Sequence, residues 1–220
     1  MKLFASWSGG KDCMLALYRV LEERKHHVAY LVNMCDKETD LSRSHGIDIG
    51  LIREQAQSIG IQIIQERTDF KGYESKFKQV IEQLKKQGVE GGIFGDIYLQ
   101  EHRDWIERVC GEMEITPFFP LWHEDTQSLL AEFVKAGFEA NIVSVRHDKM
   151  GKEWLGRRLD QDFIDEITQT TMDPCAENGE YHTFVHDGPI FAHALNIQTE
   201  GIRSDDRHWY LTVHSKQTAK

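Results

Sequence analysis

The sequence predicts an α/β protein, in which a parallel-sheet domain is followed by a smaller α+β domain. In the first half of the chain, short apolar runs alternate with amphipathic stretches whose apolar residues recur every three or four positions. Such alternation implies βαβ units, a parallel sheet and helices on both of its faces. After Pro120 the alternation stops. We therefore expect an N-terminal domain of residues 1–120 and a C-terminal domain of residues 121–220.

The elements of the first domain follow from local patterns. Apolar runs predict strands at residues 2–7, 28–33, 61–64, 92–95 and 115–119. Helices are expected between them, at residues 13–25, 48–59, 73–88 and 105–113. Asp48 has a side chain suited to an N-cap, and Gly60 and Gly88 are of the type that commonly ends helices.

The second domain is expected to mix both kinds of element. Asp125 caps a helix that stops at Gly137, and a shorter helix is expected at residues 160–167. Strands are expected at residues 140–145, 191–197 and 209–213. The stretch 173–188, which precedes the last two strands, is rich in Gly, Pro, Asn and acidic residues.

Composition excludes several classes of protein. The 220 residues include 26 Lys and Arg against 36 Asp and Glu, a net charge of -10. A protein that coats duplex DNA needs a dominant basic surface, so this balance argues against one, although it leaves room for a local basic pocket. No apolar run approaches the roughly 20 residues of a membrane helix. The four cysteines are far apart and form no Cys-x-x-Cys pair, which suggests free thiols in a cytoplasmic protein.

The strongest local signal is the segment from Ser8 to Cys13, between the first strand and the first helix. Gly9 and Gly10 allow a sharp turn and a close approach to a ligand. The helix that follows offers unpaired N–H groups and a positive dipole end, while Lys11 adds a mobile positive charge. We expect a phosphate to bind there; the alternative is a plain turn with a surface lysine. Ligands of parallel sheets bind at the carboxyl ends of the strands, where this loop lies.

These residues resemble the PP-loop of the N-type ATP pyrophosphatases, although Cys13 stands where that loop usually has serine. Further blocks resemble the diphthine–ammonia ligase family and its uncharacterised prokaryotic relatives. The blocks are residues 7–12, Gly95-Asp96-Ile97, Pro120-Leu121-Trp122, residues 154–157 and residues 177–185. The resemblance implies an adenine nucleotide alpha hydrolase-like first domain and an acceptor-binding second domain.

The resemblance also implies an activity. Enzymes of this family adenylate an acceptor carboxylate with ATP and release pyrophosphate, and ammonia then displaces AMP to leave an amide. The acceptor in the family is diphthine, a modified histidine of elongation factor 2 on the route to diphthamide. A small carboxylate is the alternative acceptor, and a homodimer is allowed. Two other readings stay open, namely a PP-loop ligase for a small metabolite and a regulator that binds ATP or AMP without turnover.

Site residues carried over from the family fall into three groups. ATP is expected to contact residues of the first domain: Ser8, Gly9, Gly10, Lys11, Asp12, Ser44, His45, Gly95 and Asp96. Asp12 is also expected to bind Mg²⁺, unless it only faces the helix dipole. The acceptor is expected to contact Arg157 and the loop residues Glu177, Asn178, Gly179 and Tyr181. Lys11, Asp12, Glu180 and His182 are expected to be catalytic. An acid and an imidazole side by side could deprotonate an incoming ammonium. The alternative for residues 177–183 is a purely structural, well-bonded turn with Gly179 at positive φ.

Overall fold

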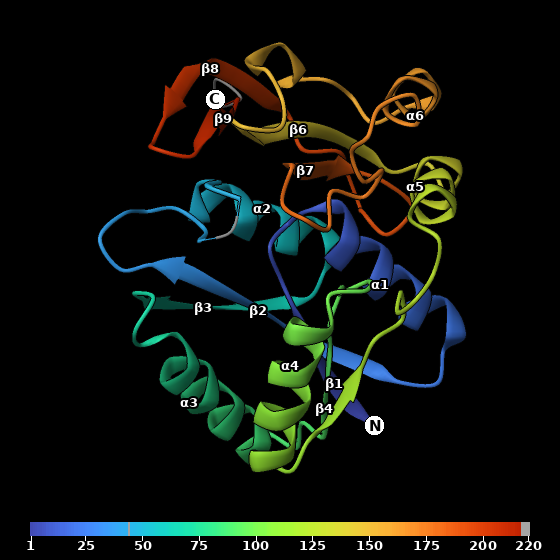
Figure 1. Ribbon diagram of the computed structural model, residues 1–220. Coiled ribbons are helices and arrows are strands. Elements are labelled where there is room, and N and C mark those ends of the chain that lie inside the picture. Colours follow the sequence, from blue (N-terminus) through green and yellow to red (C-terminus); the bar gives the residue numbers. More distant parts are fainter. Residues whose placement is uncertain (44, 217–220) are drawn as a thin grey trace.

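The computed structural model of the protein describes residues 1–43 and 45–216. Two sheets are stacked, with helices between them and on the far face of the first sheet (Figure 1). The elements of the first sheet and its helices are β1 (Lys2–Ser6), α1 (Lys11–Glu23), β2 (His27–Asp36), α2 (Ile49–Ile59), β3 (Gln62–Thr68), α3 (Tyr73–Lys86), β4 (Gly91–Ile93), α4 (Gln100–Glu112) and β5 (Thr116–Phe118).

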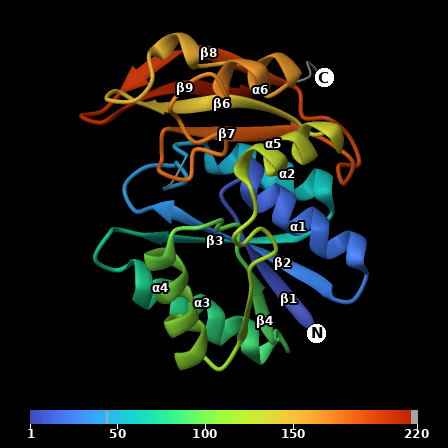
Figure 2. The same ribbon diagram turned by 45° about the vertical axis from the view of Figure 1, so that its right-hand side comes forward.

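The first sheet is parallel and has the strand order β3-β2-β1-β4-β5. The predicted fold class is therefore confirmed. The chain leaves β1 toward β2 on one side and returns to β4 on the other, so the topological switch lies between β1 and β4. Helices α3 and α4 cover one face, whereas α1 and α2 cover the face toward the second sheet (Figure 2). The described part of the chain has no helix both long and apolar enough to cross a membrane.

The second sheet is antiparallel, with the order β7-β6-β9-β8. Its elements and helices are α5 (Thr126–Lys135), β6 (Glu139–Arg146), a 3-10 turn η1 (Lys152–Trp154), α6 (Gln161–Ile167), β7 (Tyr181–Asp187), β8 (Ile197–Ser204) and β9 (His208–Ser215). The predicted caps are present, since Asp48 and Asp125 accept hydrogen bonds from first-turn N–H groups of α2 and α5.

One predicted strand is wrong. Residues 191–196 form no strand, and β8 begins only at Ile197. The segment instead turns at Gly188 and binds the end of α2, where the Ala192 N–H donates to the Ser58 carbonyl at 2.8 Å. The strand of this region is β7, inside the stretch that was noted for its turn-forming and acidic residues. Helix α4 also begins at Gln100, five residues earlier than expected.

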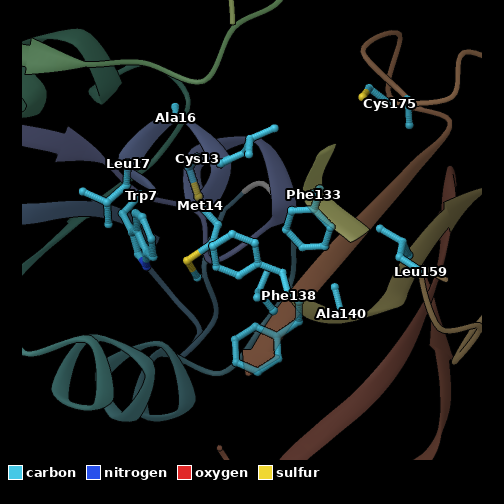
Figure 3. Packing of buried hydrophobic residues seen from close by; sticks show 14 of the residues in the cluster. Trp7, Cys13, Met14, Ala16, Leu17, Phe133, Phe138, Ala140, Leu159 and Cys175 are labelled. Atoms are coloured by element: carbon cyan, nitrogen blue, oxygen red, sulfur yellow. The ribbon is translucent and has the colours of Figure 1, made fainter. Parts of the chain in front are cut away.

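One apolar core cluster runs through both halves of the chain, while a second lies under α3 and α4. Residues of β1 and α1, such as Leu3 and Met14, belong to the same buried cluster as Phe133, Phe138 and Phe184 from the second half. Phe133 and Phe138 stack at 5.0 Å, and the α1 residue Met14 lies between them and Trp7 (Figure 3). Helices α1 and α2 are thus packed between the sheets, which fixes β7 against the loop that precedes α1. The exact division at residue 120 stays a prediction.

Candidate functional site

The loop between β1 and α1 is held in place by β7 of the other sheet. The Val185 N–H donates to the Gly9 carbonyl at 3.0 Å, and the Lys11 N–H donates to Oγ1 of Thr183 at 3.0 Å. The buried side chain of Gln55 in α2 joins the two segments, because its Nε2 donates to the carbonyls of Gly9 (3.0 Å) and Val185 (2.6 Å). The loop backbone is therefore fixed by the protein itself.

Three glycines allow the backbone to pack this closely. Gly9 has a φ of +82°, in the left-handed region that favours glycine. A Cβ on Gly10 would lie 2.3 Å from Cε1 of His45, and a Cβ on Gly95 would lie 2.8 Å from backbone atoms of Asp12 and Cys13. The start of α1 therefore lies directly against the end of β4, at the topological switch.

The start of α1 keeps free hydrogen-bond donors. Its N-cap, Gly10, supplies no side-chain acceptor, and its own N–H donates to Oγ of Ser8 at 3.3 Å. Within the described residues, the N–H groups of Asp12 and Cys13 have no hydrogen-bond acceptor. The Cys13 thiol donates to the Gly10 carbonyl at 3.2 Å, and burial raises its pKa, so it stays neutral. Free N–H groups at a helix N-terminus suit an anion such as phosphate.

A cavity of about 220 Å³ opens at the carboxyl ends of β1, β2 and β4. We call it the first cavity; its polar lining residues include Ser8, Asp12, Asn33, His45, Asp96 and Glu177. None of its lining residues, all within the described chain, is Lys or Arg. A polyanion in this cavity would therefore need a metal ion or charge from outside its walls.

The carboxyl groups of the first cavity are crowded. Burial raises the pKa of Asp12, and the nearby carboxylates of Asp173 and Asp96 add to the rise, although Lys11 opposes it. Burial also raises the pKa of Glu177, helped by Asp12 and Asp96. Nowhere in the described residues do three His, Cys, Asp or Glu side chains converge to hold a metal ion by themselves. This crowding fits a divalent cation bound by a carboxylate or two together with oxygens of a ligand.

A second cavity of about 490 Å³ adjoins the first and shares Asp12, His45 and Glu177 with it. Its other lining residues include Lys11, Asn178, Gly179, Tyr181, His182 and Thr183. The second cavity therefore joins the loop before α1 to the acid-rich segment that precedes β7.

Lys11 faces the second cavity and is not a mobile surface charge, so that expectation is corrected. Its residue is only 4% exposed, and its Nζ donates to Oδ2 of Asp12 at 2.9 Å and to the Cys175 carbonyl. The Nζ also lies 5.2 Å from the centre of the Tyr181 ring. Burial alone would lower the pKa of Lys11, but Asp12 and the polar groups of Tyr181 and Cys175 raise it above its ordinary value. The ammonium group therefore stays charged.

Two histidines lie over the loop before α1. His45 Nδ1 and the Thr183 carbonyl are 2.8 Å apart, and the His45 ring lies 4.6 Å from the ring of His182. Burial lowers the pKa of His45 to about 4 and holds the pKa of His182 well below its usual value. Both imidazoles are therefore neutral at pH 7.

The segment before β7 is tied to the loop after β4. Oε1 of Glu177 accepts hydrogen bonds from the N–H groups of Ile97 (2.8 Å) and Tyr98 (3.3 Å). Asn178 Nδ2 donates to the Tyr98 hydroxyl at 2.9 Å. Glu180 is 5% exposed, and its Oε2 has no hydrogen-bond partner among the described residues. Gly179 has a φ of +77°, as a turn at this point requires.

The structure brings most of the predicted site residues together around the two cavities. Glu180 lies just behind the lining, next to Asn178, at 3.4 Å between Oε1 and Nδ2. Arg157 lies apart, paired with Glu166 at 3.5 Å, and lines neither cavity. Ser44 lies outside the described residues. All assigned roles stay predictions.

Sequence reasoning missed three residues that hold the site: Gln55, Thr183 and Cys175. Thr183 lies within the block used for the resemblance, but its contact with the Lys11 N–H depends on how the sheets stack. Gln55 and the Cys175 carbonyl carry no local signal at all, because their partners are more than 40 residues away in sequence.

Comparison with known proteins identifies the family. The family model described as diphthamide synthase N-terminal domain matches residues 1–117, and the diphthamide synthase C-terminal domain matches residues 125–219. The chain belongs to the diphthamide synthase family. Diphthine–ammonia ligase of Homo sapiens is 25% identical over 229 residues, which cover 92% of this chain and 85% of the human protein. The Danio rerio diphthine–ammonia ligase is 26% identical over 237 residues, covering 94% and 91%.

The predicted resemblance is thus confirmed, and so is the predicted class of enzyme, an ATP-dependent ligase that forms a carbon–nitrogen bond.

Among solved structures, a predicted subunit of a tRNA methyltransferase from Methanocaldococcus jannaschii has a TM-score of 0.44. It is 15% identical and covers 84% of this chain and 96% of its own. A likeness this low says nothing of function.

The lowered pKa of His45 predicts how stability depends on pH. As pH falls, the imidazole of the unfolded chain takes up a proton near its ordinary pKa of about 6.5. The folded one stays neutral until about pH 4. Protonation therefore favours the unfolded chain, and the stability contributed by neutral His45 is full above pH 6.5 and lost as pH falls toward 4.

We expect the difference in unfolding free energy between wild type and His45→Gln to narrow by about 2 kcal/mol from pH 7 to pH 4.5. Urea denaturation at both pH values measures it. His27→Gln, which removes an exposed imidazole, is the matched control. If the difference in unfolding free energy between wild type and His45→Gln is the same at both pH values, His45 is not buried as the structure has it.

Proposed function

We propose that this chain is an AMP-forming amide ligase: it adenylates an acceptor carboxylate, releases pyrophosphate and lets ammonia displace AMP. The observation that carries the proposal is the pair of joined cavities at the start of α1. One cavity presents free backbone N–H groups, and the other presents a buried, charged lysine beside neutral imidazoles. The relatives named diphthine–ammonia ligase support the same reaction class.

In this proposal ATP spans both cavities. The nucleoside occupies the first cavity, at the ends of β1, β2 and β4, beside Ser8, Gly95 and Asp96. The phosphates lie beside Ser8 at the start of α1 and accept hydrogen bonds from the N–H groups of Asp12 and Cys13. The predicted contacts with Gly9 and Gly10 are not adopted, because Gln55 and His45 cover these glycines and neither glycine lines a cavity. Lys11 supplies positive charge from the second cavity.

Mg²⁺ fits the crowded carboxylates of the first cavity. Asp12 and Asp96 would hold it together with phosphate oxygens, and it would neutralise the triphosphate where the wall offers no Lys or Arg. This crowding, with the raised pKa of Asp12, is the feature of the chain that supports a metal ion here.

The chemistry follows from charge and proton balance. A carboxylate oxygen of the acceptor attacks the α-phosphorus, the bond to the bridging oxygen breaks, and pyrophosphate leaves. Lys11 stabilises the negative charge that shifts onto the phosphates during this step. Ammonia then attacks the acyl carbon, and AMP leaves with the electron pair of the broken bond. The nitrogen loses a proton, for which the neutral imidazole of His182 has a free lone pair. Glu180 acts through Asn178, whose Nδ2 donates to Oε1 of Glu180 at 3.4 Å, to orient the attacking nitrogen.

The acceptor is proposed to enter the second cavity along the segment Glu177–Tyr181. The names of the relatives point to diphthine, which elongation factor 2 carries, and a small carboxylate is the alternative. Arg157 would meet only a large acceptor that extends beyond the cavity, because it lies apart from the lining residues. A cytoplasmic location and a homodimer stay predictions of the sequence.

The direct test supplies ATP, Mg²⁺ and ammonium with diphthine-bearing elongation factor 2 or with a panel of small carboxylates, and measures pyrophosphate and AMP. We expect both products to form in equal amounts, only with an acceptor present. Nucleotide binding without AMP formation with any acceptor would instead indicate a regulator. Turnover with a small carboxylate alone would replace diphthine as the acceptor.

A single substitution distinguishes nucleotide binding from turnover of the acceptor. Glu180→Gln keeps the shape of the side chain, and Glu180 lines neither cavity. We expect this variant to bind a non-hydrolysable ATP analogue within about twofold of wild type but to lose at least roughly 100-fold in acceptor-dependent AMP formation. Calorimetry and a coupled pyrophosphate assay measure the two effects.

The exposed Glu23, changed to Gln, is the matched control and should leave both quantities unchanged. If Glu180→Gln instead loses affinity for the analogue and keeps its turnover, Glu180 belongs to the nucleotide site and its assigned role is wrong.

A further inference from the structure

The hairpin of β8 and β9 contacts the loop between β2 and α2, which borders the proposed nucleotide site. Most residues of β8 are exposed, and β8 pairs only with β9 in the second sheet. One of its side chains nevertheless reaches the loop between β2 and α2, where Nη2 of Arg203 donates to the Gly46 carbonyl at 2.9 Å. The same guanidinium lies 4.0 Å from the centre of the Tyr210 ring on β9.

The contact is tight enough that a side chain at position 46 would force Arg203 and Tyr210 to shift. A Cβ on Gly46 would lie 2.4 Å from Nη2 of Arg203 and 2.8 Å from Cδ1 of Tyr210. Gly46 also has a φ of +64°, which disfavours other residues. The Tyr210 ring is itself fixed, because its hydroxyl donates to Oδ2 of Asp205 at 2.9 Å. The side chains of Arg203 and Tyr210 therefore pack directly against the backbone of Gly46.

The residue before Gly46 is the histidine that covers the loop before α1. The His45 ring lies so close to Gly10 that a Cβ there would meet it at 2.3 Å, and the ring contacts the Thr183 carbonyl. On the other side, the Gly46 N–H donates to the Ser42 carbonyl of the same loop at 3.0 Å, and Asn33 of β2 donates from its Nδ2 to Oγ of Ser42 at 3.1 Å. From the second sheet, Arg203 holds the Gly46 carbonyl, so Gly46 is bound on both sides.

We propose that the β8–β9 hairpin is part of the nucleotide site, with Arg203 as a positioning residue that acts through Gly46 on His45. The inference rests on the proposed function in one respect: ATP must bind at the loop before α1. The C-terminal domain then contributes to nucleotide binding as well as to acceptor binding. Arg203 touches no substrate; it keeps the His45 ring over Gly10, so that ATP meets a site that is already ordered.

The test measures binding of α,β-methylene-ATP with Mg²⁺ to the 220-residue chain by calorimetry. Arg203→Met keeps an unbranched apolar stem but removes the donors, and we expect it to weaken binding about fivefold. Arg203→Lys, which can still donate to the Gly46 carbonyl, should recover part of that loss. Gln198→Met, at an exposed position of the same strand, should bind as wild type does.

A double-mutant cycle with His45→Ala distinguishes positioning from a merely structural role. If Arg203 acts through His45, then Arg203→Met has little further effect on affinity once His45 is Ala. Equal losses in both backgrounds would overturn the proposal, and so would an unchanged affinity of Arg203→Met alone. If wild type binds no analogue at all, the proposed function fails; that outcome is distinct, because the proposal on Arg203 predicts a difference between variants of a protein that binds.

Discussion

The hydrogen bonds between β7 and the loop before α1 are the interaction on which the rest of this structure depends. They join the parallel sheet to the antiparallel one through Gly9, Lys11, Thr183 and Val185. Gln55 adds a second link from α2, and its Oε1 accepts the indole N–H of Trp7 at 2.8 Å. Because both ends of the loop are held, its backbone needs no ligand to order it. The two N–H groups that follow, of Asp12 and Cys13, stay free for an anion.

Charge is divided between the two cavities. The first has carboxylates on its wall and lacks Lys and Arg among its lining residues, whereas the second contains the buried ammonium of Lys11 beside His45 and His182. Lys11 stays charged because Asp12 is its partner, and the imidazoles stay neutral because burial disfavours their charged form. The first cavity therefore suits a cation and the second an anion, as the proposed function requires.

The local patterns of the chain predicted the fold well because parallel sheets leave clear periodicity. The five strands of the first sheet, its four helices and the caps at Asp48 and Asp125 all follow from such patterns. The error at residues 191–197 has a tertiary cause, since that segment binds Ser58 of α2 in place of a neighbouring strand. The candidate site was found by its glycines and by resemblance. The direction of Lys11, the link through Gln55 and the contact of Arg203 with Gly46 depend on how the sheets stack, which no local pattern encodes.

Amide hydrogen exchange of the 220-residue chain, with and without a non-hydrolysable ATP analogue and Mg²⁺, tests the central claim most directly. The N–H groups of Val185 and Lys11 should exchange slowly in both states, because β7 and the loop already bond each other. Those of Asp12 and Cys13 should exchange fast in the free protein and become protected only with the nucleotide. If the Val185 N–H exchanges as fast as those of exposed β8, or if nucleotide leaves Asp12 and Cys13 unchanged, the account is contradicted.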